Sequence, residues 1–316
     1  MKLSIVIPCF YSGKSLRKVV NDILCRLSEQ TVDEYEMILV NDGSSDDTYE
    51  IIKGLAMEYQ NITGINLAKN EGQHNAIMAG FHYITGDYVM VCSDDGQSPI
   101  ESVGQMIEGL NQQYDVVCAK YMQRNSRNLF RELGTSINSF FSSWLIEQPK
   151  GISFSVDFMA KRFVIDEILN YKGPYCYIGG LIYRTTQNVG NIEAVQHHRG
   201  TGQSGYTLNK LIKLCLNGFT AFSVKPLRVS AFVGVFFAFS GFILAVVVLI
   251  RKLLNMSVQI GWSSVIIIML ISFGLIMIML GMIGEYIGRI YMCINSSPQY
   301  VIKESVNVKI MEENDR

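Results

Sequence analysis

Charged residues are scarce in this 316-residue sequence, and the two signs nearly cancel. Lys, Arg, Asp and Glu together make up 17% of the residues and leave a formal net charge of -1. A chain with this balance has no overall electrostatic attraction to phosphate backbones, so we expect no nucleic-acid partner. In place of charge, 49% of the residues are hydrophobic, which is high for a soluble protein, and the excess lies chiefly after Pro226.

Clustered cysteines are also absent. The seven cysteines contain no C-x-x-C pair and form no ligand set with histidine. They are Cys9, Cys25, Cys92, Cys118, Cys176, Cys215 and Cys293. This scatter argues against a zinc site and predicts reduced, buried thiols in a cytosolic compartment. His197 and His198 have no other histidine or cysteine at ligand spacing, so structural or surface roles are expected for them.

The N-terminus lacks the pattern of a secretory signal peptide. Residues 3–7 form a short β-branched apolar run that is typical of a strand, and no cationic segment is followed by a long apolar one. We therefore expect no secretory signal.

The first 120 residues alternate between two hydrophobic periodicities. Short apolar runs lie at 3–7, 35–40, 62–67, 87–92 and 115–119, and stretches with helical spacing include 15–27, 46–59 and 73–84. Alternating strands and helices predict an α/β fold with a mostly parallel sheet and helices on both faces. Ligands of such folds bind beyond the carboxyl ends of the strands.

Four of the predicted strands end in polar, turn-forming clusters. The clusters are residues 8–13, 41–48, 69–73 and 93–97. Each has a local explanation, because Ser44 can cap a helix and Asp42 can stabilise its own turn. Their recurrence at successive strand ends indicates a shared site, and adjacent carboxylates at Asp94 and Asp95 repel unless a cation or hydrogen-bond donors compensate. The pattern outlines a metal and phosphate site.

A nucleotide-hydrolysing P-loop is one interpretation of the first cluster. Gly13-Lys14-Ser15 resembles the end of such a loop, and an apolar strand leads to Asp94. The first glycine of the loop is missing, because position 8 is proline. Pro8 has no N–H to offer a phosphate and a fixed φ, which argues against an ATPase or GTPase.

A family resemblance explains the clusters together. The motifs are Ser4-Ile5-Val6-Ile7-Pro8, Asn41-Asp42-Gly43-Ser44-Ser45-Asp46-Asp47-Thr48, Asn70-Glu71-Gly72-Gln73 and Ser93-Asp94-Asp95-Gly96-Gln97, with Gly202, Ser204, Tyr206 and Gly284-Glu285-Tyr286 later in the chain. In this order and spacing they resemble family 2 glycosyltransferases of the GT-A fold. The branch that they match is the polyprenyl-phosphate glycosyltransferases, related to dolichyl-phosphate mannose synthase.

The resemblance implies roles at the donor site. Asp42 would contact the uracil or ribose of a nucleotide-sugar, and Pro8 would line the base pocket. Residues placed beside the donor by the same motifs are Ser44, Asn70, Gly72 and Asp94. The second aspartate of the family's Asp-x-Asp motif maps to Asp95, which would hold Mg²⁺ or Mn²⁺ with or without help from Asp94. Ser93 stands where the first aspartate commonly lies.

Cationic side chains would meet the acceptor phosphate. Arg124, Arg127 and Arg131 are spaced to share one helical face, and Arg199 and Ser204 are further candidates; a solvated surface face is the alternative for the triplet. The resemblance places a catalytic base at Asp157, before Phe158. A phosphomonoester acceptor has a second pKa near 6 and is already largely anionic at neutral pH, so it needs positioning more than deprotonation.

The chain after residue 228 predicts membrane spans. Residues 229–250 and 260–283 are apolar runs, and the first, of about 22 residues, would extend roughly 33 Å as a helix. We divide the chain into a catalytic domain at 1–207, an interfacial amphipathic segment at 208–228, two transmembrane helices within 229–290 and a cytoplasmic tail at 291–316. Within the second span, Glu285 is expected to pair with Arg289 one turn on.

The flanking charges predict orientation. Arg251 and Lys252 lie in the short connection, whereas Lys225, Arg228, Arg289 and Lys303 lie on the other side. This balance places the catalytic domain in the cytoplasm at the inner membrane, as cytosolic nucleotide-sugars require.

These observations lead to one hypothesis and two alternatives. The hypothesis is an inverting, metal-dependent transferase that moves a sugar from a nucleotide-sugar, such as a UDP-sugar, to a polyprenyl phosphate such as undecaprenyl phosphate. A transferase that uses a hydroxyl acceptor, for which Asp157 would be an indispensable base, is the first alternative. The second is an inactive transferase fold that serves as a membrane scaffold. The sequence leaves open the sugar and the presence of a homo-oligomer.

Overall fold

A computed structural model describes most of the chain. The described residues are 1–28, 32–121, 149, 151–173, 176–194, 225–254, 261–295 and 298–308. The chain divides into two compact units, Met1–Thr207 with Ser296–Arg316, and Leu208–Asn295.

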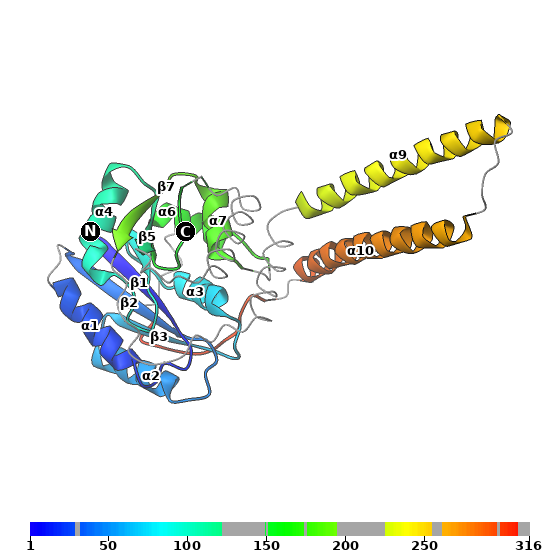
Figure 1. Cartoon of the computed structure of the whole chain (residues 1–316). Helices are drawn as coiled ribbons and strands as arrows, with labels where there is room; N and C mark the ends of the chain where they lie inside the picture. Colours follow the sequence, from blue (N-terminus) through cyan, green and yellow to red (C-terminus); the bar gives the residue numbers. More distant parts are fainter. Residues whose placement is uncertain are drawn as a thin grey trace, which may run out of the picture. The chain divides into compact units, whose positions relative to one another are not determined.

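The first unit is built on one eight-stranded sheet in the order β7-β5-β6-β4-β1-β2-β3-β8 (Figure 1). Its strands are β1 (Lys2–Cys9), β2 (Glu34–Asn41), β3 (Ile62–Leu67), β4 (Tyr88–Val91), β5 (Val116–Tyr121), β6 (Phe158–Lys161), β7 (Val189–Ala194) and β8 (Ile302–Val306). Strands β4, β1, β2 and β3 pair in parallel, and so do β5 and β7. Only β6 and β8 run antiparallel to their neighbours. The predicted α/β fold with a mostly parallel sheet is confirmed.

Helices cover both faces of this sheet (Figure 1). They are α1 (Leu16–Ser28), α2 (Thr48–Glu58), α3 (Gln73–Phe81), the 3₁₀ turn η1 (Ile100–Ser102), α4 (Val103–Gln112), α6 (Arg162–Leu169) and α7 (Ile178–Thr185). The buried residues of α1 form a stripe along one side of the helix: Leu16, Val19, Val20, Ile23 and Leu27. This stripe packs in one hydrophobic core with residues of α2 and α4 and with alternate residues of the strands. On the other face, α3 packs so closely that a Cβ on Gly80 would lie 2.5 Å from Val6.

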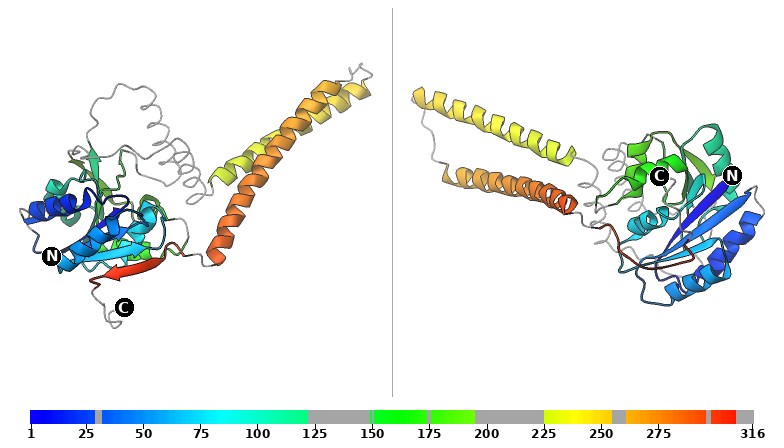
Figure 2. Two further views of the ribbon diagram at one scale, coloured as in Figure 1. Left: turned by 90° about the horizontal axis from the view of Figure 1, so that it is seen from below. Right: turned by 180° about the vertical axis from the view of Figure 1, so that it is seen from behind.

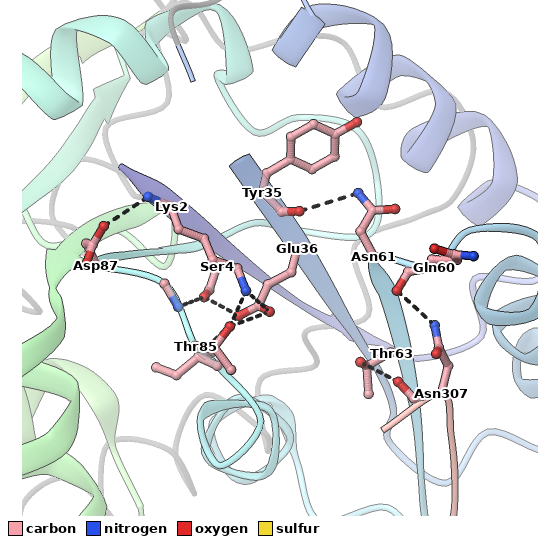
Figure 3. A network of polar contacts seen from close by, with 12 residues as sticks. Lys2, Ser4, Tyr35, Glu36, Gln60, Asn61, Thr63, Thr85, Asp87 and Asn307 are labelled. Atoms are coloured by element: carbon pink, nitrogen blue, oxygen red, sulfur yellow. Dashed lines mark hydrogen bonds and ion pairs between the residues drawn. The ribbon is translucent and has the colours of Figure 1, made fainter. Parts of the chain in front are cut away.

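A buried polar network fixes the amino ends of the strands (Figure 3). Glu36, which is 6% exposed, accepts hydrogen bonds from Ser4 Oγ at 2.7 Å and Thr85 Oγ1 at 2.7 Å, and pairs with Lys2 Nζ at 2.9 Å. Burial alone would raise the pKa of Glu36, but these donors lower it below its usual value. The network ties β1 and β2 to the segment that enters β4, and so sets their register.

Strand β8 has no counterpart among the predicted strands, because its three central residues are exposed and its sequence contains no apolar run. It pairs antiparallel with β3, from Gly64 opposite Val306 to Leu67 opposite Ile302 (red in the left view of Figure 2). Asn307, at φ 55°, donates from Nδ2 to the Ile62 carbonyl at 2.7 Å. Part of the segment expected as a tail therefore covers β3, which would otherwise be an edge strand of the sheet.

The second unit contains two long helices, α9 (Lys225–Leu253) and α10 (Trp262–Ile294). One stretch of α10, Ile271–Ile294, is long and apolar enough to cross a membrane, and none of it is buried within the structure. In α9 the apolar stretch among the described residues is Val229–Ile243, which is shorter than a span. The predicted pair of Glu285 and Arg289 is confirmed, with Nη2 and Oε1 2.8 Å apart.

The prediction for the cysteines is correct in part. Among the described residues, Cys9, Cys92 and Cys118 are free and buried. Cys25 and Cys293 are free but exposed, so the prediction of burial is wrong for these two. Cys25 lies on the solvent side of α1, and Cys293 on the uncovered surface of α10.

Candidate functional site

The loops that leave β1, β2, β3 and β4 meet at one edge of the sheet, since these four strands are parallel. Hydrogen bonds join each loop to the next. Phe10 N–H donates to Asp94 Oδ2 at 3.1 Å, and Tyr11 N–H donates to Ser44 Oγ at 3.0 Å. Asn70 Nδ2 donates to Asp42 Oδ2 at 3.1 Å. The four polar clusters of the sequence thus form one continuous surface.

Pro8 explains where the β4 loop begins. The last bond between β1 and the β4 side is donated by Cys92 N–H to the Val6 carbonyl at 3.0 Å. In a parallel ladder the next bond would need an N–H at position 8, which proline lacks. Pro8 remains paired in register with Val40 of β2 and is buried. The chain after Cys92 is therefore released from the sheet and turns at Ser93–Gly96.

Asp42 is the centre of the junction between the β2 and β3 loops. It is 3% exposed, and its carboxylate accepts hydrogen bonds from Glu71 N–H at 2.8 Å and Gly72 N–H at 3.0 Å in addition to the one from Asn70. Burial raises the pKa of Asp42 to about 6, and these backbone donors oppose the shift. The structure thus brings the candidates Asp42, Asn70 and Gly72 into direct contact.

Gly43 is required by the close approach of these two loops. It has φ +64°, and a Cβ there would lie 2.3 Å from the carbonyl carbon of Lys69 and 2.5 Å from Asn70 N. Both atoms belong to the backbone and cannot move aside as a side chain would. Only glycine fits both the conformation and the space.

Asn41, the last residue of β2, has a local role. Its Nδ2 donates to Asn66 Oδ1 at 2.8 Å, and its Oδ1 accepts from Ser44 N–H at 3.2 Å. Ser44 in turn holds Tyr11 through its hydroxyl. The amide therefore joins β2 to β3 and shapes the loop that follows β2.

Two aromatic residues of the β1 loop were not among the sequence candidates. Phe10 and Tyr11 are 47% and 57% exposed, and their rings meet edge to face with centroids 4.6 Å apart. Tyr11 has φ 54°, which is uncommon for a residue other than glycine, and its hydroxyl lies 2.8 Å from Ser45 Oγ. A strained, hydrogen-bonded aromatic residue beside carboxylates marks a candidate site. No sequence signal distinguishes it from an ordinary turn residue.

The adjacent carboxylates of the β4 loop point in different directions. Asp94 Oδ2 accepts hydrogen bonds from the Ser12 hydroxyl and Phe10 N–H, so this side chain holds the β1 loop. Asp95 Oδ1 accepts from Ser93 Oγ at 2.7 Å and Gln97 N–H at 3.1 Å. Burial raises the pKa of Asp94, and the neighbouring charge of Asp95 adds to the shift.

Asp157 lies at the same edge although its strand is antiparallel. It directly precedes β6, which is inserted between β4 and β5, so its backbone starts where those strands end. Asp157 is 8% exposed and accepts hydrogen bonds from Ser98 Oγ and Tyr121 OH, both at 2.5 Å. Burial raises its pKa, and the charge of Asp95 contributes in the same direction. The hydrogen bonds from Ser98 and Tyr121 oppose this shift.

The chemistry of these side chains fits a divalent cation. Carboxylate oxygens at the end of β4 are the hard ligands that Mg²⁺ and Mn²⁺ prefer, and the charge of Asp95 raises the pKa of both Asp94 and Asp157. Within the described parts of the chain, no group of three or more His, Cys, Asp or Glu could hold an ion by itself. A cation bound here would take further oxygen ligands from a substrate phosphate.

Five candidates lie outside the described residues. They are Arg124, Arg127, Arg131, Arg199 and Ser204, together with the predicted interfacial segment up to residue 224. Their roles stay predictions.

Comparison with known proteins gives consistent matches. The sequence model described as "Glycosyl transferase family 2" matches residues 4–184. The chain is 32% identical over 308 residues to an undecaprenyl-phosphate 4-deoxy-4-formamido-L-arabinose transferase of Photorhabdus laumondii, covering 96% of this chain and 94% of that protein. It is 30% identical over 310 residues to the SfII prophage-derived bactoprenol glucosyl transferase of Shigella flexneri, covering 96% and 98%.

A solved structure supports the fold. Glucosyl-3-phosphoglycerate synthase from Mycobacterium tuberculosis, in complex with Mn²⁺, UDP-glucose and phosphoglyceric acid, superposes with a TM-score of 0.50. The sequence identity is 15%, and the match covers 70% of this chain and 79% of the other. At this identity the likeness concerns the fold alone.

Proposed function

Because the chain belongs to glycosyl transferase family 2, we propose that this glycosyltransferase moves one sugar from a nucleotide-sugar to a polyprenyl phosphate. The observation that carries the proposal is similarity over nearly the whole length, membrane-type helix included, to proteins named as undecaprenyl-phosphate and bactoprenol sugar transferases. A soluble acceptor would give no reason for the apolar stretch Ile271–Ile294.

The junction between the β1, β2 and β3 loops is the proposed donor site. Asp42, fixed by Asn70 and two backbone N–H groups, presents an acceptor for ribose or base hydrogens. Pro8 is the buried end of β1 next to this junction, and the exposed ring of Tyr11 offers an apolar face on which a base can stack. A UDP-sugar is the donor that we propose.

Asp95 is the proposed metal residue. Asp94 is committed to Ser12 and Phe10 of the β1 loop, so it positions that loop and is the weaker ligand candidate. When bound, Mg²⁺ or Mn²⁺ would supply charge for the leaving nucleoside diphosphate. Ser93, in place of a first aspartate, binds Asp95 through its hydroxyl and orients it.

The proposed reaction is a single displacement. An oxygen of the acceptor phosphate attacks the anomeric carbon, the bond from that carbon to the donor diphosphate breaks, and the nucleoside diphosphate leaves with the electron pair. Attack opposite the leaving group inverts the anomeric configuration. Asp157 lies on the same edge and would take a proton from any acceptor phosphate that arrives protonated, whereas the arginines would bind its charge.

The membrane arrangement completes the proposal. Helix α10 would span the membrane through Ile271–Ile294 and α9 would form the other helix of a hairpin. The catalytic unit would face the cytoplasm at the inner membrane, where nucleotide-sugars are made. The product would serve cell-surface glycan modification.

Transfer of radiolabel tests this function. UDP- and GDP-sugars would be offered with undecaprenyl phosphate in detergent and Mg²⁺ or Mn²⁺, using the wild type, Asp95→Ala and the control Asp22→Ala. Asp22 is an exposed carboxylate on α1. We expect organic-extractable label with the wild type and the control, and its loss with Asp95→Ala.

Each other outcome contradicts a specific part. No labelled lipid from any donor would refute the polyprenyl-phosphate acceptor, and label on a hydroxyl acceptor would favour the glycolipid or polysaccharide alternative. Full activity of Asp95→Ala would refute the metal assignment.

A further inference from the structure

Two neighbouring serines each donate a hydrogen bond to a different carboxylate at the carboxyl edge of the sheet. Ser93 Oγ donates to Asp95 Oδ1 at 2.7 Å and lies 3.1 Å from Ser98 Oγ. Ser98 Oγ donates to Asp157 Oδ1 at 2.5 Å. Ser98 also accepts from Ser93 N–H at 2.8 Å, so the β4 loop is closed on itself around the two serines.

The opposite side of Asp157 is held by Tyr121. Tyr121 is the last residue of β5, and its hydroxyl donates to Asp157 Oδ2 at 2.5 Å. The backbone of Asp157 is fixed as well, because its carbonyl accepts from Ala119 N–H at 3.0 Å. Both oxygens of the carboxylate therefore have a hydroxyl donor from a different strand end.

Because Asp157 is buried, its two hydroxyl donors determine how its carboxylate is oriented. Asp157 is 8% exposed and Ser98 5%, so water cannot easily replace a lost donor. Burial, with the charge of Asp157, raises the pKa of Tyr121, which means that the phenol keeps its proton and acts as the donor. Asp95 and Asp157 would otherwise repel each other and turn apart.

We propose that Tyr121 and Ser98, with Ser93, are positioning residues that hold the Asp157 carboxylate in one orientation beside Asp95 for glycosyl transfer. The inference rests on the proposed function. It gives these three residues a role in positioning the carboxylate, and it adds no contact with the substrate. Ser93 has two roles in this arrangement: its hydroxyl donates to Asp95, and its backbone N–H donates to Ser98 Oγ, the group that in turn donates to Asp157.

The physical reason is preorganisation. A reacting group displaced by about 1 Å can lose on the order of 100-fold in rate, even when substrate binding is unchanged. Without the Tyr121 hydroxyl, the buried Asp157 Oδ2 would lose its hydroxyl donor, and the carboxylate would be free to rotate. Turnover should then fall while the donor loops, which do not contact Tyr121 in the hydrogen-bond network, keep their affinity.

Tyr121→Phe is the variant that tests the proposal, because it removes one oxygen and keeps the ring. Tyr88→Phe is its matched control, since it removes the same atom from the first residue of β4, where the hydroxyl donates to Asn111 Oδ1. For both variants we would measure kcat, the donor KM, UDP binding with Mn²⁺ and the unfolding temperature.

The expected result for Tyr121→Phe is a fall in kcat of about ten-fold or more, with donor KM and UDP affinity within about two-fold of the wild type. Ser98→Ala should show the same split, and Ser98→Thr, which keeps a hydroxyl, should recover part of the loss. Tyr88→Phe should change none of these values.

Two outcomes would overturn the inference. One is a kcat of Tyr121→Phe within two-fold of the wild type. The other is an equal loss of kcat and UDP binding with a lower unfolding temperature, which would show that the hydroxyl only supports the fold. Failure of the wild type to label any lipid would refute the proposed function instead, so the two failures are distinguishable.

Discussion

Gly43→Ala tests the idea that the donor site depends on close contact between two loop backbones. The substitution places a Cβ 2.3 Å from Lys69 C and 2.5 Å from Asn70 N, whereas ordinary contacts begin at 3.4 Å. The β2 and β3 loops must therefore separate by roughly 1 Å, and alanine at φ +64° adds about 1 to 2 kcal/mol of strain.

The displacement acts directly on Asp42. Its bonds to the β3 loop are 2.8 Å from Glu71 N–H, 3.0 Å from Gly72 N–H and 3.1 Å from Asn70 Nδ2. A shift of about 1 Å would stretch most of them beyond hydrogen-bonding distance and leave the buried carboxylate without its donors. We expect kcat/KM for the nucleotide-sugar to fall about 100-fold, mainly through a higher donor KM.

The assay is lipid-linked transfer at varied donor concentration, combined with the unfolding temperature of the protein without substrate. Gly151→Ala is the control, because Gly151 has φ +85° and, among the residues that the structure describes, no atom lies within 4 Å of the added Cβ. It carries the backbone strain without the clash and should keep the donor KM within about two-fold. A Gly43→Ala protein with wild-type donor KM would refute the reasoning that contact between these loops shapes the site.

Two further predictions concern stability. The folded pKa of Asp42 is raised from 3.8 to about 6, so the stability that this group contributes is complete below pH 3.8 and is lost as pH rises through 6. Between pH 4 and 7 the unfolding temperature should therefore fall by more in the wild type than in Asp42→Asn. Equal falls in the two proteins would contradict the raised pKa. Asn307→Ala removes an Nδ2 donor that lies 2.7 Å from the Ile62 carbonyl and puts alanine at φ 55°. Chemical unfolding should show that the free energy of unfolding falls by about 1 to 2 kcal/mol, whereas Lys303→Ala, at an exposed residue of β8, should leave it unchanged. An unchanged free energy of unfolding for Asn307→Ala would show that this end of β8 does not stabilise β3.

Much of the fold follows from local pattern. The apolar runs at 3–7, 35–40 and 62–67 correspond to β1, β2 and β3, because strands buried on both faces must be continuously apolar. Strand β6 was missed, since four residues give too short a pattern, and β8 was missed because an edge strand with exposed side chains needs no hydrophobic signal. Helical segments for α9 and α10 were anticipated, with the span-length stretch later in α10 than the predicted 260–283.

The candidate site, like the fold, was predictable from the sequence only in part. Asp42, Asp94 and Asp95 were found because parallel strands deliver their carboxyl ends to one edge, which is a consequence of sequence order alone. Their separate tasks were not found. That Asp94 holds the β1 loop while Asp95 contacts Ser93 depends on side-chain directions that neighbouring residues in the sequence do not reveal.

The sequence by itself determined the α/β alternation, the strand-end clusters, the family and the apolar C-terminal helices, because each depends on residues close together in the chain. Only the tertiary structure decided that Asp157 is held by Ser98 and Tyr121, 59 and 36 residues away, and that a strand 240 or so positions after β3 covers its edge. Such partners are chosen by the packing of the whole sheet, in which the energy of a contact does not depend on its separation along the chain, so no local pattern encodes them.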